Sequence, residues 1–333
     1  MMQMTVLASG SKGNSTVVSS SKTRVLVDAG LSCRELLRRM AIVGENPETL
    51  DAILITHEHQ DHVGGLGVMA RRLGIPVYFT EQTHRAWVRM LTPRTTMTYA
   101  QWLDHVQREK AERAARTAAA QGEQMDSEVA TMAAEADVSP VRGEDAEAQL
   151  AVDPDLCEPA AKAYPASLPA VEYFVAGGDF QIGDITVHPF TIPHDAADPC
   201  GFVFEAEGVR MAMATDLGYV PPNVKMALRR CDVMLLESNH DLEMLKDGPY
   251  PWAVKQRVLS RVGHLSNDAT AEFLTNDYDG GAAYVVLGHL SESNNLPELA
   301  RMSAERAMGG RMSLLENKLL LARQDAPLDS ICL

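Results

Sequence analysis

The chain has 333 residues, of which 46% are hydrophobic, and this is enough apolar sequence to bury the core of one large α/β domain. Its formal net charge of −15 argues against a protein that holds long duplex nucleic acid through many backbone phosphates. The five cysteines are scattered and form no C-x-x-C pair, and no signal peptide or apolar run of membrane-span length is evident, so we expect a cytoplasmic protein.

Short apolar runs and capping residues predict alternating strands and helices in the N-terminal part of the chain. The predicted strands are 5–8, 16–20, 24–27, 52–56 and 77–80, and the predicted helices are 34–43, 63–73 and 83–91. Ser32 is the expected N-cap of the first helix, because its hydroxyl can accept a backbone N–H from the first turn. This order of elements is typical of an α/β domain.

A change of composition between residues 92 and 171 interrupts the pattern. Ala, Glu, Gln and Asp dominate residues 111–163, which contain few large apolar side chains. Residues 114–136 favour a helix by propensity, yet the composition supports little core. We therefore predict one domain over residues 1–333, with 92–171 as an Ala/Glu-rich insertion that is helical or partly disordered.

The strands and helices resume after the insertion. The predicted strands are 185–190, 202–205, 209–214, 232–237 and 283–287, and the predicted helices are 224–230, 252–261, 269–276 and 296–308. Two groups of strands, each accompanied by helices, favour two sheets packed face to face with the helices outside.

The most distinctive motif is HxHxDH, formed by His57, His59, Asp61 and His62 directly after the strand-like run 52–56. Imidazoles at the first and third positions of an extended turn can point to the same side, where they can bind one metal ion. The carboxylate and third imidazole that follow can close around a second ion. Four such side chains at this spacing rarely coincide in an ordinary polar loop, so the motif predicts a site for two metals.

This motif resembles that of the metallo-β-lactamase fold superfamily, and the resemblance requires three further ligands downstream. Candidates occur in the expected order, each directly after an apolar, strand-like run: His194, Asp216 and His289. The resemblance implies an α/β fold in the form of a four-layer αββα sandwich, with two mixed sheets inside and helices outside.

The same resemblance implies how the ligands divide between two ions. One ion would be held by His57, His59 and His194, the other by Asp61, His62 and His289, with Asp216 shared. Imidazole and carboxylate ligands suit two divalent ions, which could be zinc, manganese or iron. Two such ions lower the pKa of a bridging water, so that hydroxide can attack a phosphoryl group, and Asp61 would also orient or deprotonate this water.

Two residues outside the ligand set narrow the expected reaction. His264 lies in a segment that resembles the His-containing loop of phosphodiesterases such as tRNase Z, and Glu237 stands where those enzymes carry a matching acidic residue. A Glu that fixes the imidazole and favours its protonated form would let His264 donate a proton to a leaving oxygen. The alternative is that His264 only packs beside the following helix.

Over residues 4–90 and 172–322 the chain resembles metallo-β-lactamase-fold hydrolases of the YycJ (WalJ) type. The stretches that carry this resemblance are 8–15, 28–30, 237–241, 248–251, 263–267 and 289–295. The resemblance implies a metal-dependent phosphodiesterase, and specifically a 5′ to 3′ exonuclease that acts on DNA ends. It leaves the oligomeric state open and implies no membrane partner.

Four residues near these motifs are candidates for substrate binding. Ser11 and Asn14 lie in a turn after the first strand, where small polar groups would line the mouth of the site. Ser266 and Asn267 follow His264, and capping of the next helix is the alternative role for both. The turn lacks the GxxxxGK[ST] pattern, so it is not a nucleoside-triphosphate loop.

The acidic charge keeps other functions open. A nuclease that holds only a strand end would need a local basic groove, for which the candidates are Lys225, Arg229, Arg230, Arg257 and Arg261. A phosphodiesterase acting on a small cyclic or modified nucleotide explains the charge more simply and is the main alternative. A thioester or lactam hydrolase would not need His264 and Glu237, and a non-catalytic regulatory protein would be expected to have lost ligands.

Overall fold

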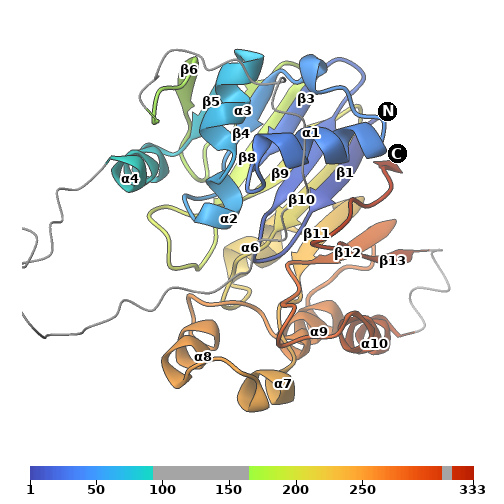
Figure 1. Cartoon of the computed structure of the whole chain (residues 1–333). Helices are drawn as coiled ribbons and strands as arrows, with labels where there is room; N and C mark the ends of the chain where they lie inside the picture. The colour runs from blue at the N-terminus through green and yellow to red at the C-terminus, as the bar shows by residue number, and fades with distance from the viewer. Residues whose placement is uncertain (93–164, 310–316) are drawn as a thin grey trace, which may run out of the picture. The chain divides into compact units, whose positions relative to one another are not determined.

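The computed structural model describes residues 1–92, 165–309 and 317–333. In these residues two mixed sheets lie face to face, with helices on their outer surfaces (Figure 1). The first sheet has the strand order β14-β1-β2-β3-β4-β5-β6, with β1 to β3 antiparallel and β3 to β6 parallel. Its strands are β1 (Gln3–Ala8), β2 (Ser15–Ser19), β3 (Arg24–Val27), β4 (Ala52–Leu54), β5 (Pro76–Phe79), β6 (Ala170–Tyr173) and β14 (Ile331–Cys332).

The second sheet has the order β13-β12-β11-β10-β9-β8-β7. Strands β7 to β10 are antiparallel and β10 to β13 are parallel. The strands are β7 (Phe180–Ile182), β8 (Ile185–Thr191), β9 (Cys200–Ala206), β10 (Val209–Ala214), β11 (Val233–Glu237), β12 (Tyr284–Gly288) and β13 (Lys318–Leu321). Because β10, β11 and β12 are parallel neighbours, the loops that follow them leave the sheet at the same edge.

Alternating side chains in the strands build cores on both faces of each sheet. In β3, Val25 and Val27 lie in the core between the sheets, whereas Leu26 packs in the core below the outer helices. Strand β10 repeats this pattern, with Met211 and Met213 in the core between the sheets. Successive side chains of a strand point to opposite faces, so a strand covered on both faces is continuously apolar.

Helices cover the outer face of each sheet. The first sheet is covered by α1 (Cys33–Ile42), α3 (Leu66–Leu73) and α4 (Glu81–Leu91), and the second by α6 (Pro222–Ala227), α9 (Asn267–Asn276) and α10 (Pro297–Met308). Three further helices are α2 (Gln60–Val63), α7 (Leu242–Asp247) and α8 (Trp252–Val258). Ser32 caps α1 as predicted, since its side chain accepts the N–H of Glu35. The predicted four-layer αββα sandwich is confirmed.

The predicted helix over 63–73 is wrong in its extent. The chain instead forms α2 and α3, separated by Gly64 and Gly65. A Cβ on Gly65 would lie 2.0 Å from the carbonyl oxygen of Leu31, so the backbone passes this neighbouring loop more closely than any side chain allows. The turn between the helices therefore depends on glycine.

Some elements are missing from the sequence-based prediction, and one predicted segment falls largely outside the described residues. Strands β6, β7, β13 and β14, helix α7 and a short 3₁₀ turn at Pro47–Thr49 are absent from it. The predicted insertion, 92–171, lies outside the described residues except for Thr92 and residues 165–171, and the helix predicted at 114–136 lies entirely outside them. No helix in the described ranges is long and apolar enough to cross a membrane.

Candidate metal centre

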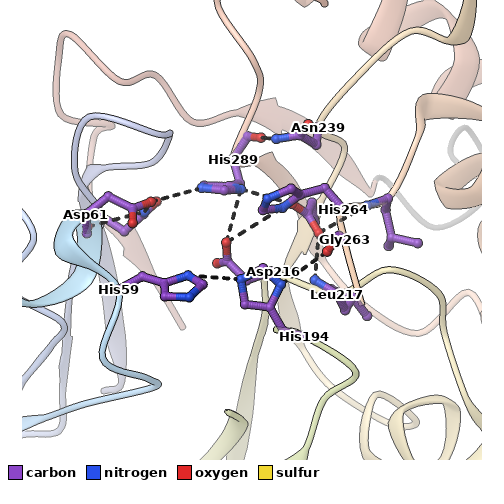
Figure 2. Close-up of polar contacts among 12 residues, drawn as sticks. His59, Asp61, His194, Asp216, Leu217, Asn239, Gly263, His264 and His289 are labelled. Atoms are coloured by element: carbon purple, nitrogen blue, oxygen red, sulfur yellow. Dashed lines mark hydrogen bonds and ion pairs between the residues drawn. The ribbon is translucent and has the colours of Figure 1, made fainter. Parts of the chain in front are cut away.

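The predicted ligands converge at one edge of the two sheets. Most of them lie in loops that follow a strand, whereas Asp61 and His62 lie in the short helix α2. His57 lies shortly after β4, His194 after β8, and Asp216 after β10. His289 follows β12 directly, and its neighbour in space Glu237 is the last residue of β11. Figure 2 shows the carboxylate of Asp216 in the middle of this group. The fold therefore brings together side chains that are far apart in the sequence.

Three residues at these strand ends have a left-handed backbone. Asp28, which follows β3, has φ 59°, while Asp216 has φ 63° and His289 has φ 55°. Residues other than glycine seldom adopt this conformation, and its strain persists only where the surroundings fix it. All three side chains are buried and make polar contacts within the centre, so the chain holds a strained backbone where functional groups must be aimed.

The first ligand group contains His57, His59 and His194, whose candidate ligand atoms all lie within 4.8 Å of one another. His194 Nε2 lies 3.2 Å from His59 Nδ1, and the ring of His57 lies edge-on to both other rings, at centroid distances of 4.6 and 5.0 Å. Three imidazoles facing one another form a nitrogen-lined site of the kind that binds a divalent ion.

The second group contains Asp61, His62, Asp216 and His289, again with ligand atoms within 4.8 Å of one another. Asp216 Oδ2 lies 3.3 Å from His62 Nε2, and its Oδ1 lies 3.4 Å from His289 Nδ1. Asp61 Oδ2 lies 3.5 Å from His289 Nε2. Asp216 also lies close enough to influence His57 of the first group electrostatically, and it is thus placed between the two groups.

The outer nitrogen of each imidazole in the first group is bound by the protein. Because the Thr56 hydroxyl donates to Asp28, its oxygen accepts the Nδ1–H of His57 at 3.0 Å. His194 donates its Nδ1–H to the carbonyl of Gly263 at 3.2 Å, and His59 donates its Nε2–H to the carbonyl of Asp195 at 3.2 Å. A second partner of this kind fixes the ring orientation and the tautomer, and it leaves the other nitrogen as a lone pair.

The second group follows the same rule, with carboxylates as the outer partners. His62 donates its Nδ1–H to Asp28 Oδ2 at 2.7 Å, and His289 donates its Nδ1–H to Glu237 Oε1 at 2.9 Å. A carboxylate partner makes the opposite nitrogen a stronger electron donor. All five imidazoles therefore direct their second ring nitrogen toward the space between them.

Several of these inward atoms have no hydrogen-bond partner in the protein. His57 Nε2, His289 Nε2 and Asp216 Oδ2 are buried and unpaired. Buried polar atoms are rarely left unpaired, because each such atom loses its hydration without compensation. Converging lone pairs of imidazole and carboxylate fit divalent cations, which would bind these atoms. The residues present thus suit the metal ions that the fold family uses.

The charges of Asp216 and of the histidines beside it depend strongly on one another. Burial alone would raise the pKa of Asp216, but His289 and His62 beside it hold that pKa well below its usual value. Burial likewise opposes a charge on His62 and His289, yet the Asp216 carboxylate raises both of their pKa values. Burial lowers the pKa of His57 and of His194. Burial therefore favours neutral rings at His57 and His194, which suits cation binding, and Asp216 carries a negative charge between the groups.

The predicted pair of Glu237 and His264 is in contact. His264 donates its Nδ1–H to Glu237 Oε1 at 2.8 Å, and the same oxygen accepts from His289. Glu237 Oε2 accepts the backbone N–H of Leu217 at 2.8 Å. Burial opposes the charge of Glu237, but these neighbours lower its pKa to about 2. Figure 2 shows the imidazole of His264 beside His289 and Asp216. The side chain of His264 is 20% exposed.

The four candidates for substrate binding have different surroundings. Asn14 is buried, and its Nδ2 lies 3.0 Å from His62 Nε2 and 3.2 Å from Asp61 Oδ2, so it contacts two predicted ligands. Ser11 is exposed in the turn after β1. Ser266 caps α9 by accepting the N–H of Ala269, which is the alternative role given for it.

Asn267 and His240 are both buried. The Asn267 side chain bonds with Ser238 Oγ at 2.7 Å and with Asn295 Oδ1 at 2.8 Å, and these contacts account for it without a substrate. His240 donates its Nδ1–H to Asn239 Oδ1 in a long contact of 3.4 Å, and burial lowers the pKa of His240 to about 4. Both residues are buried side chains, His240 shortly after Glu237 in the chain and Asn267 at the start of α9.

Two contributors to the centre are absent from the predicted site. Asp28 is the clearer one, since its carboxylate holds both Thr56 and His62. Its signal in the sequence is a carboxylate directly after the buried strand β3, the same signal that marks Asp216 after β10. The second is the ion pair of Asp195 with Arg257. These residues are far apart in the sequence, so no local pattern predicts their contact.

Comparison with known proteins agrees with this geometry. The family model of the metallo-beta-lactamase superfamily matches residues 8–289. The exodeoxyribonuclease WalJ of Streptococcus pneumoniae serotype 2 (strain D39 / NCTC 7466) is 32% identical over 298 residues, which cover 90% of this chain and 85% of that protein. The exodeoxyribonuclease YycJ of Bacillus anthracis is 30% identical over 311 residues, covering 92% of this chain and 89% of that protein.

A solved structure supports the same fold. The metallo-beta-lactamase fold protein YhfI from Bacillus subtilis matches with a TM-score of 0.58 and 13% identity, covering 98% of each chain. At this identity the match concerns the fold alone, whereas the family model and the curated relatives match the sequence over most of its length. The chain therefore belongs to the metallo-beta-lactamase superfamily of metal-dependent hydrolases.

Proposed function

We propose that this protein is a metal-dependent phosphodiesterase that degrades DNA from its 5′ end. The observation that carries the proposal is the contact of His264 with Glu237 directly beside the two ligand groups, because a phosphodiester needs a proton at its leaving oxygen and a lactam or thioester site would not need this pair. The curated relatives that match most of the chain are named exodeoxyribonucleases, which supports DNA as the substrate. The 5′ to 3′ direction is part of the proposal.

We propose two divalent ions as cofactors, held by the seven predicted ligands. One ion would be bound by His57, His59 and His194, the other by Asp61, His62 and His289, with Asp216 shared. Nitrogen and oxygen donors of this kind suit zinc or manganese, and iron as a third choice. When bound, such ions supply a nucleophile by lowering the pKa of a water molecule, and they neutralise negative charge on the phosphate.

The protein's own groups would move the proton. Glu237 accepts the Nδ1–H of His264, so the Nε2 of this imidazole is the atom left to face a substrate. In the protonated ring, Nε2–H would donate to the leaving oxygen as the phosphorus–oxygen bond breaks, and the neutral ring would regain a proton from solvent. Asp61, at the partly exposed side of the second group, is the remaining carboxylate able to orient the attacking water.

Asp28→Asn should weaken metal binding by about 10- to 100-fold while the protein stays folded. Asn tolerates the positive φ of this position. In Asp28 the backbone N–H of Thr56 and the imidazole of His62 bind different carboxylate oxygens, and an amide has only one oxygen to accept them. Affinity is measured by competition with a chromogenic chelator. Asp51→Asn is the matched control, since the Asp51 carboxylate accepts a backbone N–H at the surface. Unchanged affinity in Asp28→Asn would remove Asp28 from the metal site.

The proposed activity is tested with a 5′-phosphorylated single-stranded DNA, labelled at either end and incubated with manganese or zinc. Stepwise release of nucleotides from the 5′ end, stopped by a chelator, is the expected result. The same preparation is assayed with bis(p-nitrophenyl) phosphate and a cyclic nucleotide. Turnover of the small diesters without any loss of DNA would overturn the nuclease.

The second candidate is a phosphodiesterase for small cyclic or modified nucleotides. The net charge of −15 favours it, because long nucleic acid is repelled by an acidic surface while a small diester is held by the metal centre alone. The assay above separates the two candidates, since only the nuclease releases nucleotides from a labelled strand.

A further inference from the structure

Two arginines lie next to the metal centre, on a segment whose helix contributes no buried side chain to the core. Helix α8 contains no buried residue, and its Trp252 side chain is 67% exposed. Arg257, in the last turn of α8, donates its Nε–H to the carboxylate of Asp195. Asp195 directly follows His194, and its Oδ1 lies 3.5 Å from His194 Nε2. The guanidinium is therefore separated from the first ligand group by a single carboxylate.

The second arginine is held beside the loop of the shared carboxylate. The Arg261 guanidinium lies 4.4 Å from the centre of the Tyr219 ring, and Tyr219 stands three residues after Asp216. A guanidinium stacked on an aromatic face is kept in place while its N–H groups remain free to bind at the edges. Arg261 itself is exposed to solvent.

Close backbone packing fixes this segment against the site. A Cβ on Gly263 would lie 2.1 Å from the carbonyl oxygen of Val258, and a Cβ on Gly218 would lie 2.4 Å from the backbone of Arg261. His264 donates its backbone N–H to the same Val258 carbonyl at 3.0 Å. The arginines thus share one rigid unit with His264, although α8 itself is exposed.

The electrostatics of Arg257 also connect it to the centre. Its hydrogen bond to Asp195 raises its pKa, and the charge of Asp61, on the opposite ligand group, contributes in the same direction. Its side chain is 60% exposed, and an exposed ion pair adds little net free energy in water. A phosphate can therefore replace Asp195 as the partner of Arg257 and gain two parallel hydrogen bonds from the guanidinium.

We propose that Arg257 and Arg261, here called the arginine pair, bind phosphates of the DNA strand next to the phosphate that is cleaved. This inference rests on the proposed function and names the residues that hold the polymer. It also accounts for a nuclease with a net charge of −15, because the positive charge needed for a strand end is concentrated beside the metals. Of the other basic candidates, Lys225 is paired with Asp277 on α9 at 2.6 Å.

The test compares Arg257→Gln and Arg261→Gln with Arg229→Gln in the full-length, metal-loaded protein. Arg229 was a candidate for the basic groove, but it is exposed and lies before β11, at the end of this strand opposite to Glu237, so it serves as the control. Each variant of the pair should raise KM for the labelled oligonucleotide about tenfold. The slope of log(kcat/KM) against log salt should decrease by about 0.7 for each lost phosphate contact. Arg229→Gln should change neither quantity.

Two further readouts separate phosphate binding from a structural role. Bis(p-nitrophenyl) phosphate carries a single phosphate, so Arg257→Gln should impair its turnover much less than that of DNA. Arg257→Lys should recover part of the salt slope, because it keeps the charge but not the bidentate geometry. Equal losses on both substrates, or a salt slope that stays at the wild-type value, would overturn the arginine pair while the nuclease stands. A wild-type protein that leaves DNA intact overturns both.

Discussion

Asp216→Ala should reduce hydrolysis of DNA and of bis(p-nitrophenyl) phosphate alike, by more than about 10³-fold. The reason is the position of this carboxylate between the two ligand groups, where it faces His62 at 3.3 Å and His289 at 3.4 Å. Its removal would take away the carboxylate that lies between these two imidazoles and leave the proposed metal ions without their shared ligand. Metal content, measured on the purified variant, should fall together with activity.

The fold should survive this change. Asp216 lies after β10, outside the core formed by the strands, so circular dichroism should match that of the wild type. His59→Ala is a second variant, which removes a ligand of the first group alone. Asp51→Ala, at an exposed turn, is the matched control and should keep full activity. Full metal content and full activity in Asp216→Ala would refute the ligand assignment.

The predicted ligands lie close together in the structure because they follow buried strands, and buried strands are easy to recognise in a sequence. Strands covered on both faces are continuously apolar, so a polar residue directly after such a run marks the sheet edge where loops converge. Asp216 after β10 and His289 after β12 follow this pattern. The two sheets and their helices were predictable for the same reason, as the buried alternation in β3 illustrates.

The elements that sequence did not reveal share a physical cause. The strands absent from the prediction, β6, β7, β13 and β14, are the outermost strands of the two sheets. An edge strand packs against fewer neighbours, so its sequence carries a weaker apolar pattern, and β6 is mostly exposed. Short length adds to this, because β14 has only two residues.

Side-chain contacts between residues far apart in the chain could not be predicted from the sequence either. Asp28, directly after β3, contacts His62 in α2, and Arg257 contacts Asp195 from an exposed helix. Asn14, which is expected to bind substrate, also contacts Asp61 and His62, and the sequence does not reveal these contacts. Small polar residues have many possible partners, and only the packing of the loops decides which one they meet.

His264→Ala should lower the rate of DNA hydrolysis by about 10² to 10⁴ and affect bis(p-nitrophenyl) phosphate much less. A sugar oxygen leaves poorly unless it receives a proton, whereas p-nitrophenolate leaves as a stable anion. The ratio of the two rates therefore reports proton donation rather than general damage to the centre. His188→Ala, on β8 and partly exposed, is the matched control. Equal losses on both substrates would reduce His264 to a packing role.

Glu237→Gln gives a different expected pattern, because Glu237 Oε1 accepts from both His264 and His289. The amide keeps one acceptor oxygen and loses the negative charge beside His264. It also weakens the partner of His289, a proposed ligand, so both substrates should slow and metal affinity should fall with them. If His264→Ala loses activity on DNA alone, His264 is the proton donor. If Glu237→Gln loses activity on both substrates, Glu237 has a role in both catalysis and metal binding.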